Sequence, residues 1–139
     1  MTEAPDTSSP VGGLQRRLAL EHEAVWLSSL VAARFDPLRD RAEAAYRRHR
    51  GSRDDLMARI ATAGATAVGP QAAYGVPPAT ADEARARMAD VLDRLCRATL
   101  PLVTLGGPDE RREAMTALRD SARSAVAWGA APTPLPGLD

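Results

Sequence analysis

Apolar residues recur at intervals of three and four along most of the chain, which is the spacing of one face of an α-helix. The pattern predicts four helices, over about 13–34, 36–63, 80–105 and 108–128. The third helix has the most regular stripe, made of Ala84, Met88, Val91, Leu95, Ala98, Leu102 and Leu105. The fourth is expected to turn inward the face that carries Met115, Leu118, Ala122, Ala125 and Val126.

Residues at the ends of these stretches match the signals that start and stop helices. Asp36–Pro37 offers a capping residue and then a proline at the first helical position, so the second helix follows the first directly. Thr80 and Glu83 form a capping-box pattern at the start of the third. Pro101 is expected to kink this helix, and Gly106–Gly107 ends it.

Three segments lack helical periodicity. Residues 1–12 are predicted to form a flexible tail and 129–139 an extended one, and 64–79 is predicted to be a long crossover loop rich in Gly and Pro. A long connection lets the third helix run parallel to the second, as in ferritin-like four-helix bundles. The sequence therefore predicts a single all-α domain, a ferritin-like four-helix bundle over 13–128.

Composition narrows the functional classes. The 139 residues and 14.8 kDa suit one domain, and 28 alanines favour helix. Eighteen arginines balance eighteen acids without any lysine, so the chain lacks the positive field of a protein that binds nucleic acid or anionic membranes. The start of the chain has no signal-peptide pattern, and no apolar run approaches the length of a membrane span. We therefore expect a cytoplasmic protein that binds neither nucleic acid nor a membrane.

Two ionisable residues fall on the inner faces of the predicted helices. At about 100° of rotation per residue, Glu21 lies in the inner stripe of the first helix and His49 in that of the second. Burial of a lone carboxylate costs several kcal/mol, so Glu21 needs a partner, a proton or a metal. We expect a core polar pair of Glu21 with His49 or Arg53, with the Ser28 hydroxyl as another possible partner.

The remaining acids are expected to point outward. Glu113 and Asp120 fall on the outer face of the fourth helix, and Asp90 and Asp93 fall on that of the third. The single cysteine, Cys96, cannot form an internal disulfide and is interpreted as a small buried filler.

The order and spacing of several short strings resemble a known family. They are LALEHEAVWL (18–27), AYRRHRGSRDDLMARIATAGA (45–65), AAYGVP (72–77), ALRDSARSAVAWGAAP (117–132) and PLPGLD (134–139). Together they resemble the ferritin-like domain of unknown function found in high-GC bacteria, over about 13–139. The resemblance implies a four-helix ferritin-like fold that usually pairs into dimers, and it implies no established reaction.

Iron-using members of the wider ferritin-like group place a Glu on each of two helices and a Glu-x-x-His on the other two. Glu21 matches the first carboxylate, but Tyr46 stands three residues before His49, and the fourth helix has no His. Two ligands cannot hold a di-iron centre, which needs about six. We therefore expect no cofactor. The alternative is an atypical oxidoreductase in which Glu21 and His49 bind iron or another divalent metal, completed by Tyr74 or a partner subunit.

Apolar residues on a second face of the first helix predict an interface with another protein chain. Trp26 and Leu30 lie on a second face of the first helix, which predicts a homodimer interface there. Alternatively, Trp26 covers the end of the bundle beneath the long loop. The arginines near His49 are interpreted as a solvated helix face, with anion binding as an alternative. The leading hypothesis is a non-catalytic, homodimeric interaction or scaffold protein.

Overall fold

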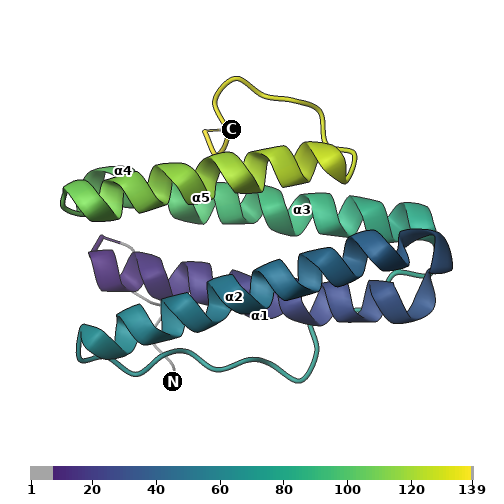
Figure 1. The fold of residues 1–139 in the computed structure, drawn as a ribbon, viewed down its shortest axis with the longest axis horizontal. Helices are drawn as coiled ribbons and strands as arrows, with labels where there is room; N and C mark the ends of the chain where they lie inside the picture. Colours follow the sequence, from purple (N-terminus) through teal and green to yellow (C-terminus); the bar gives the residue numbers. More distant parts are fainter. Residues whose placement is uncertain (1–7, 139) are drawn as a thin grey trace.

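The computed structural model describes residues 8–138, and within them the chain is all-α, as predicted (Figure 1). Its four long helices are α1 (Pro10–Arg34), α2 (Arg39–Thr62), α3 (Ala81–Thr99) and α5 (Pro108–Ala127). A 3-10 turn, η1 (Asp36–Leu38), precedes α2, and the short α4 (Leu102–Leu105) precedes α5.

The start of α1 differs from the predicted boundary. The helix begins at Pro10, inside the expected 1–12 tail, because the Ser9 side chain accepts a hydrogen bond from the Gly12 N–H. That bond satisfies one of the free amide groups of the first turn. The rest of the expected tail, residues 1–7, lies outside the described residues.

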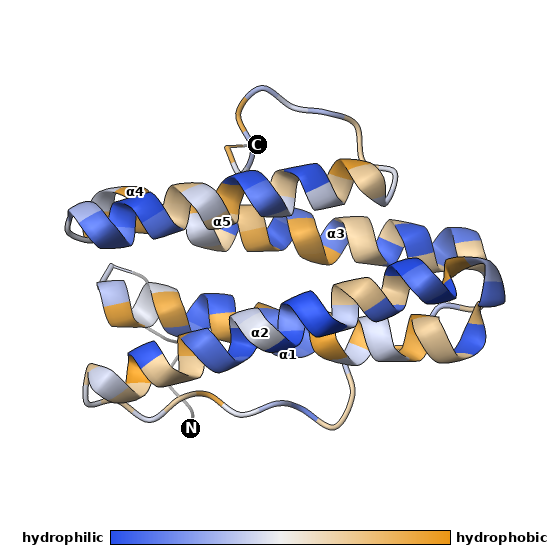
Figure 2. Ribbon diagram, viewed as in Figure 1, coloured by the Kyte–Doolittle hydropathy of each residue, from blue (hydrophilic) through white to orange (hydrophobic). Residues whose placement is uncertain are grey.

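The helices are arranged as two neighbouring pairs. α1 packs against α2, α3 packs against α5, and contacts between α1 and α3 join the pairs (Figure 1). α2 and α5 carry hydrophilic residues along much of their length (Figure 2). Among the helices of the described residues, none combines the length and the apolar character that a bilayer-spanning helix requires.

Residues 63–80 contain no helix and return along α1, so that α2 and α3 run in the same direction (Figure 1). The Gln15 side chain donates to the Thr66 carbonyl at 2.7 Å and accepts from the Val68 N–H at 2.8 Å. Nε2 of His22 lies 2.9 Å from the Val68 carbonyl. These bonds fasten the returning segment to α1.

Pro101 ends a helix instead of kinking it. α3 stops at Thr99, and α4 begins after Leu100 and Pro101. Proline has no amide hydrogen to continue the helical ladder, and its ring clashes with the preceding turn.

The apolar core is divided into two clusters along the helix axes. One contains Leu27, Val31, Met88, Val91 and Trp128, and the other contains Leu14, Leu18, Leu56, Ile60 and Leu102. Between them along the helices lie buried polar side chains from α1, α2 and α3: Glu21, His49 and Thr99. Arg17 is also buried and lies beside Leu18 in the second cluster. The interruption of the core by polar side chains marks the candidate site.

Candidate functional site

A cleft of about 500 Å³ lies between α2 and α5, with α1 and α3 at its floor. Polar residues spaced three or four apart line both of its walls. They are Arg48, Ser52 and Asp55 on α2 and Glu113, Thr116, Asp120 and Ser124 on α5. Such faces offer little apolar surface to bury against each other, so α2 and α5 stay apart while each packs on its other neighbour.

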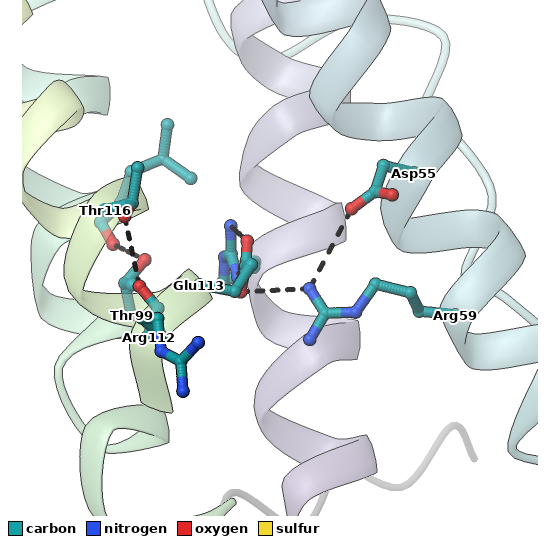
Figure 3. Close-up of polar contacts among 8 residues, drawn as sticks. Asp55, Arg59, Thr99, Arg112, Glu113 and Thr116 are labelled. Atoms are coloured by element: carbon teal, nitrogen blue, oxygen red, sulfur yellow. Dashed lines mark hydrogen bonds and ion pairs between the residues drawn. The ribbon is translucent and has the colours of Figure 1, made fainter. Parts of the chain in front are cut away.

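Contacts at two places along α2 tie it to α5. Nη1 of Arg59 lies 3.0 Å from Oε2 of Glu113 (Figure 3). Towards the start of α2, Arg41 donates to the Ala127 carbonyl at 2.7 Å, and its guanidinium lies 5.5 Å from the centre of the Trp128 ring. These links hold the walls of the cleft at a defined separation.

Glu21 and His49 meet at the floor of the cleft. Oε2 of Glu21 lies 2.6 Å from Nδ1 of His49, and both side chains are buried. At this separation the two atoms share one hydrogen bond. Nε2 of His49 is also buried and has no hydrogen-bond partner among the described residues. The carboxylate therefore fixes the orientation of the ring, and Nε2 is left free for a molecule in the cleft.

A second charged cluster lies beside this pair. The two terminal nitrogens of Arg17 hydrogen-bond to both oxygens of Glu113 at 3.0–3.2 Å. Arg59 approaches the same carboxylate, and Asp55 lies 3.9 Å from Arg59 (Figure 3). Arg17 is 4% exposed, and its Nε finds no hydrogen-bond partner within the described chain.

The cluster changes the acidity of Glu113. Partial burial opposes ionisation, but the hydrogen bonds from Arg17 and the charges of Arg17 and Arg59 outweigh it, so the pKa of Glu113 lies below its ordinary value. Glu113 is thus ionised at neutral pH, and its negative charge offsets one of the two positive charges of Arg17 and Arg59.

The predicted orientation of α5 is wrong for Met115, Val126 and Glu113, although Ala125 is buried as expected. Met115 and Val126 are 45% and 43% exposed, Ala114 and Ala125 are buried, and Glu113 turns into the bundle. The apolar stripe suggested a helix packed on the core along one broad face. α5 instead packs on α3 with a narrow alanine-bearing face and presents its polar flank to the cleft.

Arg53 and Ser28 do not join the Glu21–His49 pair. Arg53 pairs with Asp54 at 2.8–2.9 Å, and Ser28 donates to the Ala24 carbonyl at 2.6 Å. Arg53 lies about 40° around the helix from His49. That rotation places it in a different surface hollow, on the side of Trp26.

The predicted interface residues lie on that same side of the molecule. The Trp26 ring contacts Tyr74 of the returning segment, with centroids 5.8 Å apart, and Leu30 is partly exposed. Part of the second face of α1 is therefore covered by the chain itself. Tyr74 lines the hollow beside Trp26, away from His49, and its hydroxyl accepts from the Gln71 N–H.

The residues of the cleft do not fit a di-iron centre. Residues 8–138 offer no group of three or more His, Cys, Asp or Glu side chains that could hold a metal ion. Oε2 of Glu21 is occupied by His49, and α3 contributes Leu92 and Leu95 to the cleft. The geometry therefore supplies no ligand set for the metal that the fold resemblance suggests.

Cys96 is buried outside the cleft. Burial raises the pKa of its thiol to about 11, so almost none of it is thiolate at neutral pH. This agrees with its interpretation as a filler.

Arg17, Glu113 and the cleft itself were not predicted from the sequence. The signal available was the polar spacing on both helices, at 48, 52 and 55 and at 113, 116, 120 and 124. This spacing acquires meaning only when the two helices are known to face each other.

The comparisons with known proteins identify a family of unknown function. No curated protein matches the chain. The crystal structure of a conserved hypothetical protein, Rv2844, from Mycobacterium tuberculosis is similar, with a TM-score of 0.80 and 26% identity over 88% of this chain and 96% of that one. A family model described as a domain of unknown function, DUF4439, matches residues 13–139. Because this match spans nearly the whole chain, the protein belongs to the DUF4439 family.

Proposed function

We propose that the protein binds a small polar molecule in the cleft between α2 and α5, as a non-catalytic helical bundle of ferritin-like topology. The observation that carries the proposal is the buried Nε2 of His49, which has no hydrogen-bond partner within residues 8–138 and belongs to a ring held in place by Glu21 at 2.6 Å. The parallel course of α2 and α3 supports the ferritin-like part of the proposal (Figure 1).

Energetics favour a ligand at this position. A buried polar atom without a partner costs about 1–3 kcal/mol. In the described part of the chain two such atoms, Nε2 of His49 and Nε of Arg17, belong to residues that line one cleft. A molecule that hydrogen-bonds to both would recover that cost. A volume of about 500 Å³ lies within the usual range for small-molecule sites.

The site is also organised before any ligand arrives. Glu21 orients His49, and Glu113 holds Arg17 from the opposite wall. Groups already held in place lose little entropy when a ligand binds, so they bind it more tightly. In this proposal the charged network is the frame of a binding site.

The two histidines of the chain allow a direct test by NMR. Nε2 of His22 is bonded to the Val68 carbonyl outside the cleft, so its imidazole signals are an internal control for those of His49. Protein labelled with 15N-histidine would be titrated with single amino acids, polyols, monocarboxylates, amines and inorganic phosphate. We expect at least one compound to shift the His49 signals and leave those of His22 unchanged.

A variant makes the test specific. Glu21→Gln should lower the affinity for that compound by about tenfold, because the His49 ring loses the carboxylate that orients it. Asp54→Asn, at an exposed position whose carboxylate pairs with Arg53, should bind as the wild type does. If no compound shifts His49 more than His22, the proposal is wrong.

A further inference from the structure

The hydrogen-bonding groups and the charges that line the cleft together define the ligand that it suits. We infer that the ligand is a neutral sugar, a monosaccharide or a disaccharide, whose hydroxyl groups accept from Arg17 and donate to Thr99 and Thr116. This inference rests on the function proposed above and specifies the ligand of the same cleft.

Three polar groups of the cleft have a fixed hydrogen-bonding direction. Nε of Arg17 is buried and only donates. The Thr99 hydroxyl donates its proton to the Leu95 carbonyl at 2.7 Å. The Thr116 hydroxyl donates to the Arg112 carbonyl at 3.1 Å (Figure 3). Both threonine oxygens are therefore left as acceptors, and a ligand that uses all three groups needs an acceptor and two donors.

A hydroxyl group also suits Nε2 of His49 in any protonation state of the ring. This buried atom, which has no partner among the described residues, donates or accepts according to the protons that the ring carries. A hydroxyl group does both, whereas a carboxylate only accepts and an ammonium only donates. A sugar carries several hydroxyl groups on adjacent carbons, so it can meet donors and acceptors of the cleft at once.

The charges around the cleft do not favour an ionic ligand. Outside the Glu21–His49 pair, the charged side chains that line or border it are Arg17, Arg48, Arg59 and Arg112, and Asp55, Asp109, Glu113 and Asp120. Four positive charges thus meet four negative ones, and the two without an ion-pair partner among the described residues, Arg48 and Asp120, have opposite signs. An anion finds no excess positive charge, and a cation would meet Arg17 at the floor. A neutral ligand avoids the cost of removing an ion from water.

The carbon skeleton of a sugar also finds a matching surface. Leu92 and Leu95 of α3 and Ala117 of α5 line the cleft beside the polar groups. A sugar ring has C–H groups on its faces and hydroxyl groups at its rim, so a face can cover these side chains while the rim reaches the polar groups. The cleft volume of about 500 Å³ has room for a monosaccharide or a disaccharide.

The test compares each sugar with derivatives that change its charge or its donors. Glucose, galactose, mannose, maltose, lactose and trehalose would be titrated against the wild-type protein, with the His49 NMR signals and calorimetry as readouts. For any binder, the uronic acid adds a carboxylate and the amino sugar adds an ammonium. In the deoxyfluoro analogues, fluorine replaces one hydroxyl group at a time and cannot donate. We expect both charged derivatives and at least one deoxyfluoro analogue to bind about fivefold more weakly than the parent, or weaker still.

Substitution on α5 locates one of the acceptors. Thr116→Val keeps the shape of the side chain and removes its oxygen, so the parent sugar should bind about fivefold more weakly. One deoxyfluoro analogue should then bind within about twofold of the parent, because its missing donor no longer has an acceptor. Thr62→Val, at an exposed position outside the cleft, should bind every compound as the wild type does. Thr116 is exposed, so the variant should fold, and circular dichroism would verify this.

The outcomes separate the two proposals. If another compound of the earlier panel shifts His49 and no sugar does, the ligand class is wrong and the binding function stands. A charged derivative that binds as tightly as the parent, a full set of deoxyfluoro analogues that bind equally well, or an unchanged affinity in Thr116→Val also overturns the sugar assignment. If neither the panel nor the sugars shift His49, both proposals are wrong.

Discussion

Glu113 bridges α1, α2 and α5, and replacing it with glutamine tests the charged frame of the cleft. In the wild type its carboxylate accepts three hydrogen-bond contacts from Arg17 and lies 3.0 Å from Arg59. Glutamine preserves the shape and one carbonyl acceptor but removes the charge. Arg17, which is 4% exposed, would then be a buried cation without an anion.

The size of the effect follows from burial. Removing one partner of a fully buried ion pair costs about 3–5 kcal/mol, because the remaining charge stays desolvated. The side chains of Glu113 and Arg59 are 37% and 26% exposed, so water screens part of this loss. We expect Glu113→Gln to lower the free energy of unfolding by about 2 kcal/mol at pH 7.

The effect should depend on pH with a definite sign. The pKa of Glu113 in the folded protein is lowered from its ordinary value of 4.5. The unfolded chain therefore binds the proton first as pH falls, and the ionised carboxylate contributes stability that is complete above pH 4.5 and is lost as pH falls through the lowered pKa. The stability difference between wild type and Glu113→Gln should be constant from pH 8 to about 5 and shrink below that.

Urea unfolding followed by circular dichroism at several pH values measures both quantities. Glu43→Gln is the matched control, because Glu43 is exposed on α2 without an ion pair among the described residues, and its change should stay within about 0.5 kcal/mol. The reasoning would be refuted by a Glu113→Gln effect below about 0.5 kcal/mol or by a difference that persists unchanged at pH 3.

Four further predictions address other parts of the molecule. Glu21→Gln should change the free energy of unfolding by about 1–3 kcal/mol, because it removes the anion bonded to His49; a change within about 0.3 kcal/mol would contradict the burial of the pair. Elemental analysis of protein purified without chelator or metal-affinity tag should find no stoichiometric iron, manganese or zinc, and metal lost in Glu21→Ala would revive the oxidoreductase alternative. Gly137 has a φ of +86°, and a Cβ there would lie 2.8 Å from the Cys96 carbonyl oxygen. Gly137→Ala should therefore loosen the C-terminal segment and speed modification of Cys96 by a thiol reagent by about tenfold, and an unchanged rate would show that this segment does not protect it. Light scattering should give twice the monomer mass of 14.8 kDa if Trp26 and Leu30 form a dimer interface, whereas a monomer mass at micromolar concentration would exclude it.

Much of the local structure was predictable because its causes are local. The Thr80 hydroxyl accepts from the Glu83 N–H, as a capping box requires, while the Glu83 carboxylate accepts from the Ala79 N–H, one residue before the N-cap. The start of α5 at Pro108 follows from the same kind of short-range signal. At Asp36–Pro37 the break between helices lies where expected, but Asp36 belongs to η1 and caps no helix, and α2 begins at Arg39. Glu21 and His49 also lie on the inward faces expected from rotation along their helices.

The same periodicity did not predict the orientation of α5. Alanine is small and only weakly apolar, so the exposed Met115 and Val126 were assigned to the buried face together with Ala125, and the buried Ala114 was not. A stripe of residues shows that a helix has an apolar side. It does not show how wide the contact is or which neighbour covers it, and Glu113 was therefore placed on the wrong side.

Local signals in the chain were enough to place the four long helices and the inward position of Glu21 and His49, because backbone hydrogen bonds and helical rotation act over a few residues. They did not place the start of α1 or the end of α3. The packing of the helices against one another sets the rest: α2 and α5 face each other across a cleft, Glu113 reaches Arg17 across 96 positions of sequence, and Nε2 of His49 has no partner among the described residues. Those features depend on how separate helices pack, and packing is set by the sum of all their surfaces.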